Sequence, residues 1–176
     1  GLAWAGEPPK TPILRIETGM HTAIIRRIST DAENRYLVTG SDDKTVRVWE
    51  IATGKLLKTL RPPIGEGNEG KIYSVAISPD GQTVACGGYT GFEWDRSCSI
   101  YLFDFESGRL TGRITGLPNV INHLVFSRDG RYLAVSLGLT NGIRVYKIGR
   151  GYGQITSELA AEDKDYGDQS YGVDFD

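Results

Sequence analysis

The side chains best suited to chemistry are few in this chain, and they are widely spaced. The sequence holds two histidines, His21 and His123, and two cysteines, Cys86 and Cys98. Neither pair has the spacing of a zinc site or a catalytic pair, and each histidine is better interpreted as a hydrogen-bonded residue near an inner strand. The cysteines flank one hairpin loop, so a disulfide is geometrically possible, while Cys86 can also be interpreted as a small buried side chain. Common hydrolase, phosphate-binding and metallopeptidase motifs are absent, so we predict no enzyme activity, cofactor or metal.

Long loops hold the residues best suited to binding a partner, because binding residues concentrate on loops carried by rigid scaffolds. Trp94 lies in the loop Gly87–Ser97 among charged residues, which is typical of an exposed binding hot spot. The alternative is that this loop folds back and Trp94 packs against Tyr89 or a neighbouring sheet. The candidate binding residues of this and two further loops, 61–70 and 160–170, are Tyr89, Phe92, Glu93, Trp94, Asp95, Arg96, Glu66, Asn68, Glu69, Tyr166 and Asp168.

Acidic residues gather in the same three loops. They are Glu66, Glu69, Glu93, Asp95, Glu162, Asp163, Asp165 and Asp168. Together they predict either an acidic rim that could receive a basic peptide or a cation, or simply a solvated loop surface.

Composition predicts one turn-rich all-β domain. The chain has 176 residues, of which 39% are apolar and 23 are glycine, and it has no long helical pattern. The formal net charge of −2 argues against a nucleic-acid-binding surface, which needs a concentrated basic face. No run of about 18 apolar residues is present, so no membrane-spanning helix is predicted.

An internal repeat organises the chain. Ser29, Ser78 and Ser127 follow similar apolar strands at intervals of 49 residues, and Tyr171–Asp176 resembles the same strand once more. Each serine is followed by a turn and three further strands, which predicts four-stranded antiparallel sheets. Because both faces of each sheet carry apolar side chains, the sheets must stack on one another. This favours a β-propeller over an open β-sandwich.

The stretch Arg35–Leu60, RYLVTGSDDKTVRVWEIATGKLLKTL, resembles one repeat of the WD-repeat β-propeller family. This resemblance implies a buried hydrogen-bond network of Thr39, Asp43 and Trp49, with His21 as its fourth member. The similarity covers about residues 12–176. The segments SDDKTVRVWE and GLPNVINHLVFSRDGRYLA also resemble the WD-repeat region of bacterial proteins that carry caspase-like peptidase domains.

The second and third units depart from the family pattern. Phe103 and Tyr146 replace the tryptophan, Ser97 and Thr140 replace the aspartate, and Cys86 and Val135 replace the threonine. The departures weaken the implied network but keep the aromatic packing.

The predicted organisation is a segment of residues 1–11, processed or a linker, followed by a partial propeller over 12–176. Its units span about 18–60, 70–115 and 118–160, with a fourth starting at 170–176. Pro12–Glu17 and Tyr171–Asp176 are predicted as orphan strands of incomplete blades. The remaining blades are expected on the same or another chain, because the family closes with about six to eight. Ala3-Trp4-Ala5 fits a signal-peptide cleavage site, which indicates export to the periplasm, with a cytoplasmic location as the alternative.

The resemblance to the WD-repeat family implies that the loops 61–70, 87–97 and 160–170 emerge on one face of the propeller. The predicted function is a non-catalytic protein-interaction scaffold or sensor, such as the regulatory propeller of a larger effector. Two alternatives stay open. The chain could be part of an enzyme whose pocket needs the missing blades, or a purely structural half-propeller.

Overall fold

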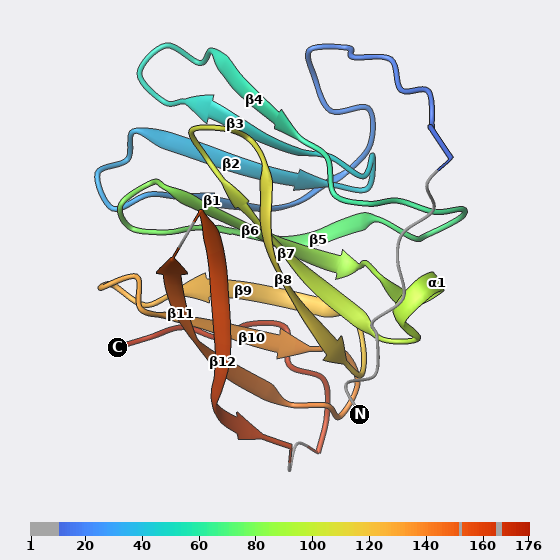
Figure 1. The fold of residues 1–176 in the computed structure, drawn as a ribbon, viewed down its shortest axis with the longest axis vertical. Coiled ribbons are helices and arrows are strands. Elements are labelled where there is room, and N and C mark those ends of the chain that lie inside the picture. The colour runs from blue at the N-terminus through green and yellow to red at the C-terminus, as the bar shows by residue number, and fades with distance from the viewer. Residues whose placement is uncertain (1–10, 152, 165–166) are drawn as a thin grey trace.

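A computed structural model describes residues 11–151, 153–164 and 167–176 as three four-stranded antiparallel sheets stacked one on the next (Figure 1). We call these sheets blades one, two and three in chain order. Blade one contains β1 (Ile25–Thr30), β2 (Tyr36–Ser41), β3 (Val46–Glu50) and β4 (Leu56–Leu60). Blade two contains β5 (Lys71–Ile77), β6 (Thr83–Tyr89), β7 (Cys98–Asp104) and β8 (Leu110–Leu117). Blade three contains β9 (Ile121–Phe126), β10 (Tyr132–Leu137), β11 (Ile143–Gly151) and β12 (Gln154–Asp163).

The all-β prediction of four-stranded propeller blades is confirmed. A single helical turn, α1 (Phe92–Asp95), interrupts the strands within the described residues, between β6 and β7. Among those residues, no helix has the length and apolar character needed to span a bilayer.

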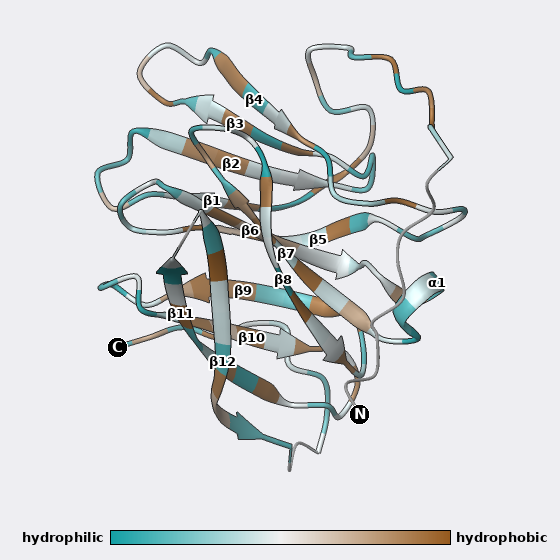
Figure 2. Cartoon of the chain, in the orientation of Figure 1, coloured by the Kyte–Doolittle hydropathy of each residue, from teal (hydrophilic) through white to brown (hydrophobic). Residues whose placement is uncertain are grey.

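The apolar core lies between the blades, and apolar residues follow the stacked strands (Figure 2). The first cluster packs residues such as Val38, Val46 and Val48 of blade one against Val75 and Tyr101 of blade two. The second cluster packs the other side of blade two against blade three. The middle sheet is thus buried on both faces. Each fully buried aliphatic side chain contributes about 1.5–3 kcal/mol of burial free energy, so stacking is the main source of stability.

The first hairpin turn of each blade is held by one polar side chain. In blade two the Ser78 hydroxyl accepts the N–H of Thr83 at 2.9 Å, and Ser127 does the same in blade three. In blade one this position belongs to Asp31, whose carboxylate accepts the N–H of Tyr36 at 2.9 Å. The predicted equivalence of Ser29 with the other two serines is therefore wrong. Ser29 instead accepts a hydrogen bond from Ile77 N–H of blade two.

Both cysteines are buried and free, so the possible disulfide does not form. Cys86 belongs to the cluster between blades one and two, whereas Cys98 belongs to the cluster between blades two and three. The two thiols therefore point to opposite faces of one sheet, and burial raises the pKa of both, that of Cys98 to about 11.

The segment Pro12–Glu17 is not the predicted orphan strand. Its backbone forms no strand ladder among the described residues, and Ile13, Leu14 and Ile16 are exposed. Its polar side chains hold it to blade one instead. Glu17 forms ion pairs with Arg47 at 2.9 Å and Arg61 at 2.8 Å, and these contacts lower its pKa to about 2.

The segment Tyr171–Asp176 has no ladder partner among the described residues, so its assignment as the first strand of a further blade stays a prediction. It lies beside β9, where the His123 ring accepts the N–H of Val173 at 3.0 Å. The loop that precedes it is shorter than predicted, because β12 continues to Asp163.

Candidate functional site

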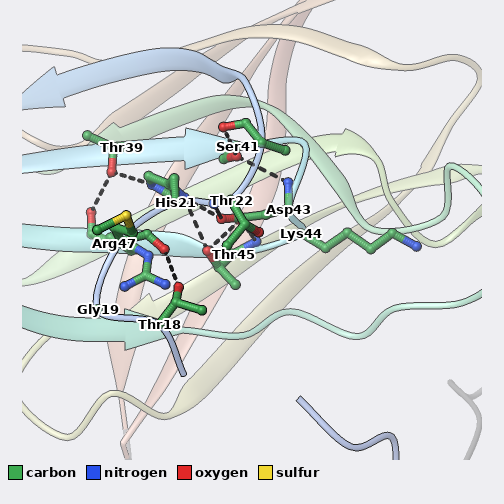
Figure 3. Close-up of polar contacts among 12 residues, drawn as sticks. Thr18, Gly19, His21, Thr22, Thr39, Ser41, Asp43, Lys44, Thr45 and Arg47 are labelled. Carbon is green, nitrogen blue, oxygen red and sulfur yellow. Dashed lines mark hydrogen bonds and ion pairs between the residues drawn. The ribbon is translucent and has the colours of Figure 1, made fainter. Parts of the chain in front are cut away.

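Four residues in and before blade one, Trp49, Thr39, His21 and Asp43, form one hydrogen-bonded chain. Figure 3 shows the last three of them. Trp49 Nε1 donates to the Thr39 hydroxyl at 3.0 Å, and that hydroxyl lies 2.7 Å from His21 Nε2. His21 Nδ1 then lies 2.8 Å from Asp43 Oδ2. The arrangement fits a neutral ring that donates from Nδ1 to the carboxylate and accepts from threonine at Nε2.

These residue types match a hydrolase triad, but their setting excludes that chemistry. The Thr39 side chain is nearly closed to solvent, with the residue only 4% exposed, and its oxygen already accepts the indole N–H. A nucleophile needs access to substrate, which burial denies to this hydroxyl. The network therefore locks the segment before β1 onto the β2–β3 turn.

Asp43 carries most of this connection. Its carboxylate accepts hydrogen bonds from His21, the Thr22 N–H, the Thr45 N–H and the Thr45 hydroxyl. Burial opposes ionisation of the carboxyl, but the hydrogen bonds outweigh burial and hold the pKa of Asp43 well below its usual value.

Blade two builds its turn with an aspartate, whereas the sequence predicted that Ser97 replaces it. Asp95, rather than Ser97, accepts the Ser99 hydroxyl at 3.0 Å and lies 3.4 Å from Arg113. Ser99 occupies the position of Thr45. Thr45 precedes Val46, which pairs with Leu60, and Ser99 precedes Ile100, which pairs with Ile114 at the equivalent point of blade two. The Asp95 carboxylate comes from α1, which is an insertion that blade one lacks.

Glu69 is a buried structural residue and does not belong to an acidic rim. The residue is 1% exposed, and its carboxylate accepts the N–H of Gly91 at 2.5 Å and the N–H of Glu93 at 3.1 Å. Burial outweighs these bonds and raises the pKa of Glu69. The result is a fixed junction between the loops 61–70 and 90–97.

Trp94 takes the second of the two predicted arrangements, in which the loop folds back and the ring packs against a neighbouring blade. It is half-buried and packs against the cluster between blades one and two. Phe92 takes the exposed position, at 38%, with its ring 5.6 Å from that of Tyr89. The sequence could not distinguish the two, because one helical turn decides which ring points inward.

A smaller set remains at the surface here. We call it the loop patch, and it consists of the exposed residues Glu66, Asn68, Phe92, Glu93 and Arg96 together with half-buried Tyr89 at the end of β6. Asp95 belongs to the interior instead, with 2% of its side chain exposed. Asp168 is exposed on the segment after β12, and Glu162 is engaged by Arg144 and Lys164. Tyr166, Asp165 and Ala3-Trp4-Ala5 lie outside the described residues.

A family model for the WD domain, G-beta repeat (WD40), matches residues 14–50 and 54–102. Over these residues the chain is similar to the WD40 repeat family. The match covers blade one and most of blade two, which includes the His21 network and the loop patch. WD40 repeats indicate a scaffold for protein–protein interaction, and the comparisons point to no enzyme family.

Relatives with curated names are similar over short stretches. Two are named Ribosome biogenesis protein BOP1 homolog, from Drosophila erecta and Drosophila melanogaster, and each is 52% identical over 40 residues. That stretch is 23% of this chain and 5% of each relative. The Culex quinquefasciatus protein of the same name is 50% identical over 60 residues, or 34% of this chain and 6% of its own. The chain thus spans only a small part of these relatives. They are insect proteins, and they give no support to a bacterial or caspase-linked context.

Proposed function

We propose that the chain is a non-catalytic scaffold whose loop patch binds a peptide through a lysine or arginine side chain. The observation that carries this proposal is the exposed Phe92 ring beside Tyr89, next in sequence to the exposed Glu93, whose carboxylate lies close to Gly65 and so brings the loop of exposed Glu66 near it. A cation is attracted both by an aromatic face and by a carboxylate, so this combination suits a basic side chain.

Rigidity of the two loops supports the same proposal. Glu69 ties the loops together by two backbone hydrogen bonds, and Lys44 Nζ donates to Gly65 O at 2.9 Å. A patch held in this way loses little conformational entropy when a partner binds. One setting for such a scaffold is ribosome biogenesis, the process in the name of the relatives that match over short stretches.

Charge reversal of the loop patch should weaken peptide binding. Peptides that contain lysine or arginine, selected from a displayed library, should bind the wild-type protein by calorimetry. The double variant Glu66→Lys and Glu93→Lys should bind them at least about tenfold more weakly, because both attractive charges become repulsive. Glu33→Lys is the matched control, since Glu33 is an exposed acid on the β1–β2 turn. Equal affinities for all three proteins would contradict the proposal.

We also propose that further blades, on the same longer chain or another chain, cover the outer face of blade one. Ile28 is 59% exposed, whereas Val75 and Leu124 are 1% and 2% exposed. The three residues are equivalent by register, because they pair with Thr39, Cys86 and Val135 of their blades. Blade one covers the equivalent residue of blade two, and blade two covers that of blade three. A missing blade would cover Ile28 in the same way.

Native mass spectrometry can test this second proposal. A species larger than the 19.3 kDa chain is expected, and Ile28→Asp should dissociate it by placing a charge in the apolar contact. Leu110→Asp is the control, because Leu110 is similarly exposed but lies in the middle blade. A lone 19.3 kDa species would overturn the idea that blade one needs a cover.

A further inference from the structure

A hollow of about 360 Å³ lies where the segment before β1 meets the residues that follow β4. Two arginines, Arg15 and Arg61, line it together with apolar side chains that include Leu110, the first residue of β8. We call this site the arginine hollow. Its volume is near the lower end of the range of about 300–1,000 Å³ that is typical of ligand pockets, so it suits one side chain or a small group.

The Arg15 guanidinium is incompletely hydrogen-bonded. Of its three nitrogens, only Nη1 has an acceptor among the described residues, the backbone oxygen of Lys44 at 3.2 Å. Nη2 is closed to solvent and has no partner there. A guanidinium offers five N–H donors in a fixed plane, so most of the hydrogen-bonding capacity of Arg15 is unmet by the described part of the protein.

The charges around Arg15 are mainly repulsive. Burial and the charge of Arg61 both lower the pKa of Arg15, while the charge of Asp43 opposes them. Lys44 and Arg15 also repel each other. The Asp43 carboxylate is already occupied by His21 and the other donors of the blade-one network, so it is not free to pair with Arg15.

Glu17 does not neutralise the hollow either, because its carboxylate already serves two arginines. It lies 2.8 Å from Arg61 Nη2 and 2.9 Å from Arg47 Nη2. No described carboxylate is paired with Arg15 alone. Positive charges that are held close together with too few counterions attract an incoming anion, and the arginine hollow is such a place.

The walls of the hollow are apolar and partly rigid. Pro62 is buried and Pro63 is half-buried, and the fixed φ angle of each proline limits how far this wall can move. Ile13 and Leu110 are 53% and 44% exposed, which leaves apolar surface to be covered. An inorganic ion covers no apolar surface, whereas an acidic side chain with an aliphatic neighbour matches both the charge and the walls.

We propose that the arginine hollow binds an aspartate or glutamate side chain that stands next to an aliphatic residue in a partner peptide. The carboxylate accepts hydrogen bonds from Arg15 and Arg61, and the aliphatic residue packs on Ile13 and Leu110. The hollow shares no residue with the loop patch and takes a group of the opposite charge. It therefore does not depend on the proposed binding of a basic side chain.

Nuclear magnetic resonance of the whole chain tests the proposal through the Nε–H signals of Arg15 and Arg61. Acetyl-leucyl-glutamyl-leucine amide should shift both signals in a saturable way. The matched glutamine peptide, acetyl-leucyl-glutaminyl-leucine amide, should bind at least about tenfold more weakly, because it offers no charge-assisted hydrogen bonds. Sodium phosphate at equal ionic strength should not saturate the signals. Equal binding of the two peptides, or binding of phosphate as tight as that of the glutamate peptide, would refute the proposal.

Two variants locate the binding site. Arg15→Met keeps much of the side-chain length and removes the charge, so it should bind the glutamate peptide at least about tenfold more weakly, with Arg61 still reporting. Arg61→Met should do the same, with Arg15 reporting. Arg131→Met is the matched control, because it removes one positive charge from an arginine whose side chain is 72% exposed and paired with Asp129. Backbone amide signals of β6 should stay in place in all variants and so report an intact fold. Wild-type affinity in both hollow variants, or an equal loss in the control, would assign the binding to another surface.

Discussion

Replacement of Asp43 with alanine should lower the free energy of unfolding by about 3 kcal/mol, because it leaves several buried hydrogen-bond donors unsatisfied. The carboxylate accepts from His21, from the backbone at Thr22 and from Thr45. Without it, the segment before β1 loses its attachment to the β2–β3 turn. Urea unfolding followed by circular dichroism would measure the change.

The adjacent residue supplies the matched control. Asp42 is also hydrogen-bonded, but its partner Arg26 has 45% of its side chain exposed, and exposed pairs contribute about 0–1 kcal/mol. Asp42→Ala should therefore cost much less than Asp43→Ala. Equal losses for the two variants would show that the network adds nothing beyond a surface charge.

The same carboxylate predicts how stability depends on pH. Because the folded-state pKa of Asp43 is lowered, its contribution is fully present above its ordinary pKa of 3.8 and is lost as the pH falls through the lower folded value. Wild-type stability should therefore fall steeply below about pH 4, and Asp43→Asn should flatten this part of the curve. A curve of unchanged slope would assign the acid sensitivity to other carboxylates.

Replacement of Trp94 with alanine should cost about 2–3 kcal/mol, less than the 3–5 kcal/mol typical of a fully buried tryptophan. The reason is that Trp94 is half-buried against the cluster between blades one and two. Thermal unfolding should show the loss directly. A neutral effect on stability would return Trp94 to the role of a binding residue.

Phe92→Ala is the companion variant, because Phe92 is the exposed ring of the same helical turn. Its unfolding free energy should stay within about 0.5 kcal/mol of the wild type. Its affinity for a lysine- or arginine-containing peptide should fall about tenfold, as expected for an aromatic hot spot. If Phe92→Ala unfolds early and still binds, the two rings have the opposite roles.

Local patterns in the sequence were sufficient to predict the blades. Alternating β-branched residues and turn residues repeat along the chain, and the apolar side chains on both faces of Val46–Glu50 required a second sheet on each side. Trp49 and its replacements Phe103 and Tyr146 were aligned in the same way. The structure pairs them with Leu37, Val84 and Leu133 at equivalent points of the three blades.

Patterns of spacing failed where an insertion changed the route of the chain. Asp95, which lies in α1, has the role in blade two that Asp43 has in blade one. Asp95 is four residues from its partner Ser99, whereas Asp43 is two residues from its partner Thr45. The 49-residue interval likewise selected Ser29, although the turn is held by Asp31. In both cases a hydrogen bond selects the residue by position in space, not by its distance along the chain.

By itself, the sequence determined that this protein is built of stacked four-stranded sheets, because strand periodicity and turn chemistry are local properties. Only the tertiary structure decided that Glu69 and Trp94 face inward, that Phe92 faces outward and that Pro12–Glu17 forms no strand. The physical reason is shared by these cases. Burial and strand pairing depend on a neighbour from a distant part of the chain, and no local pattern encodes where that neighbour lies.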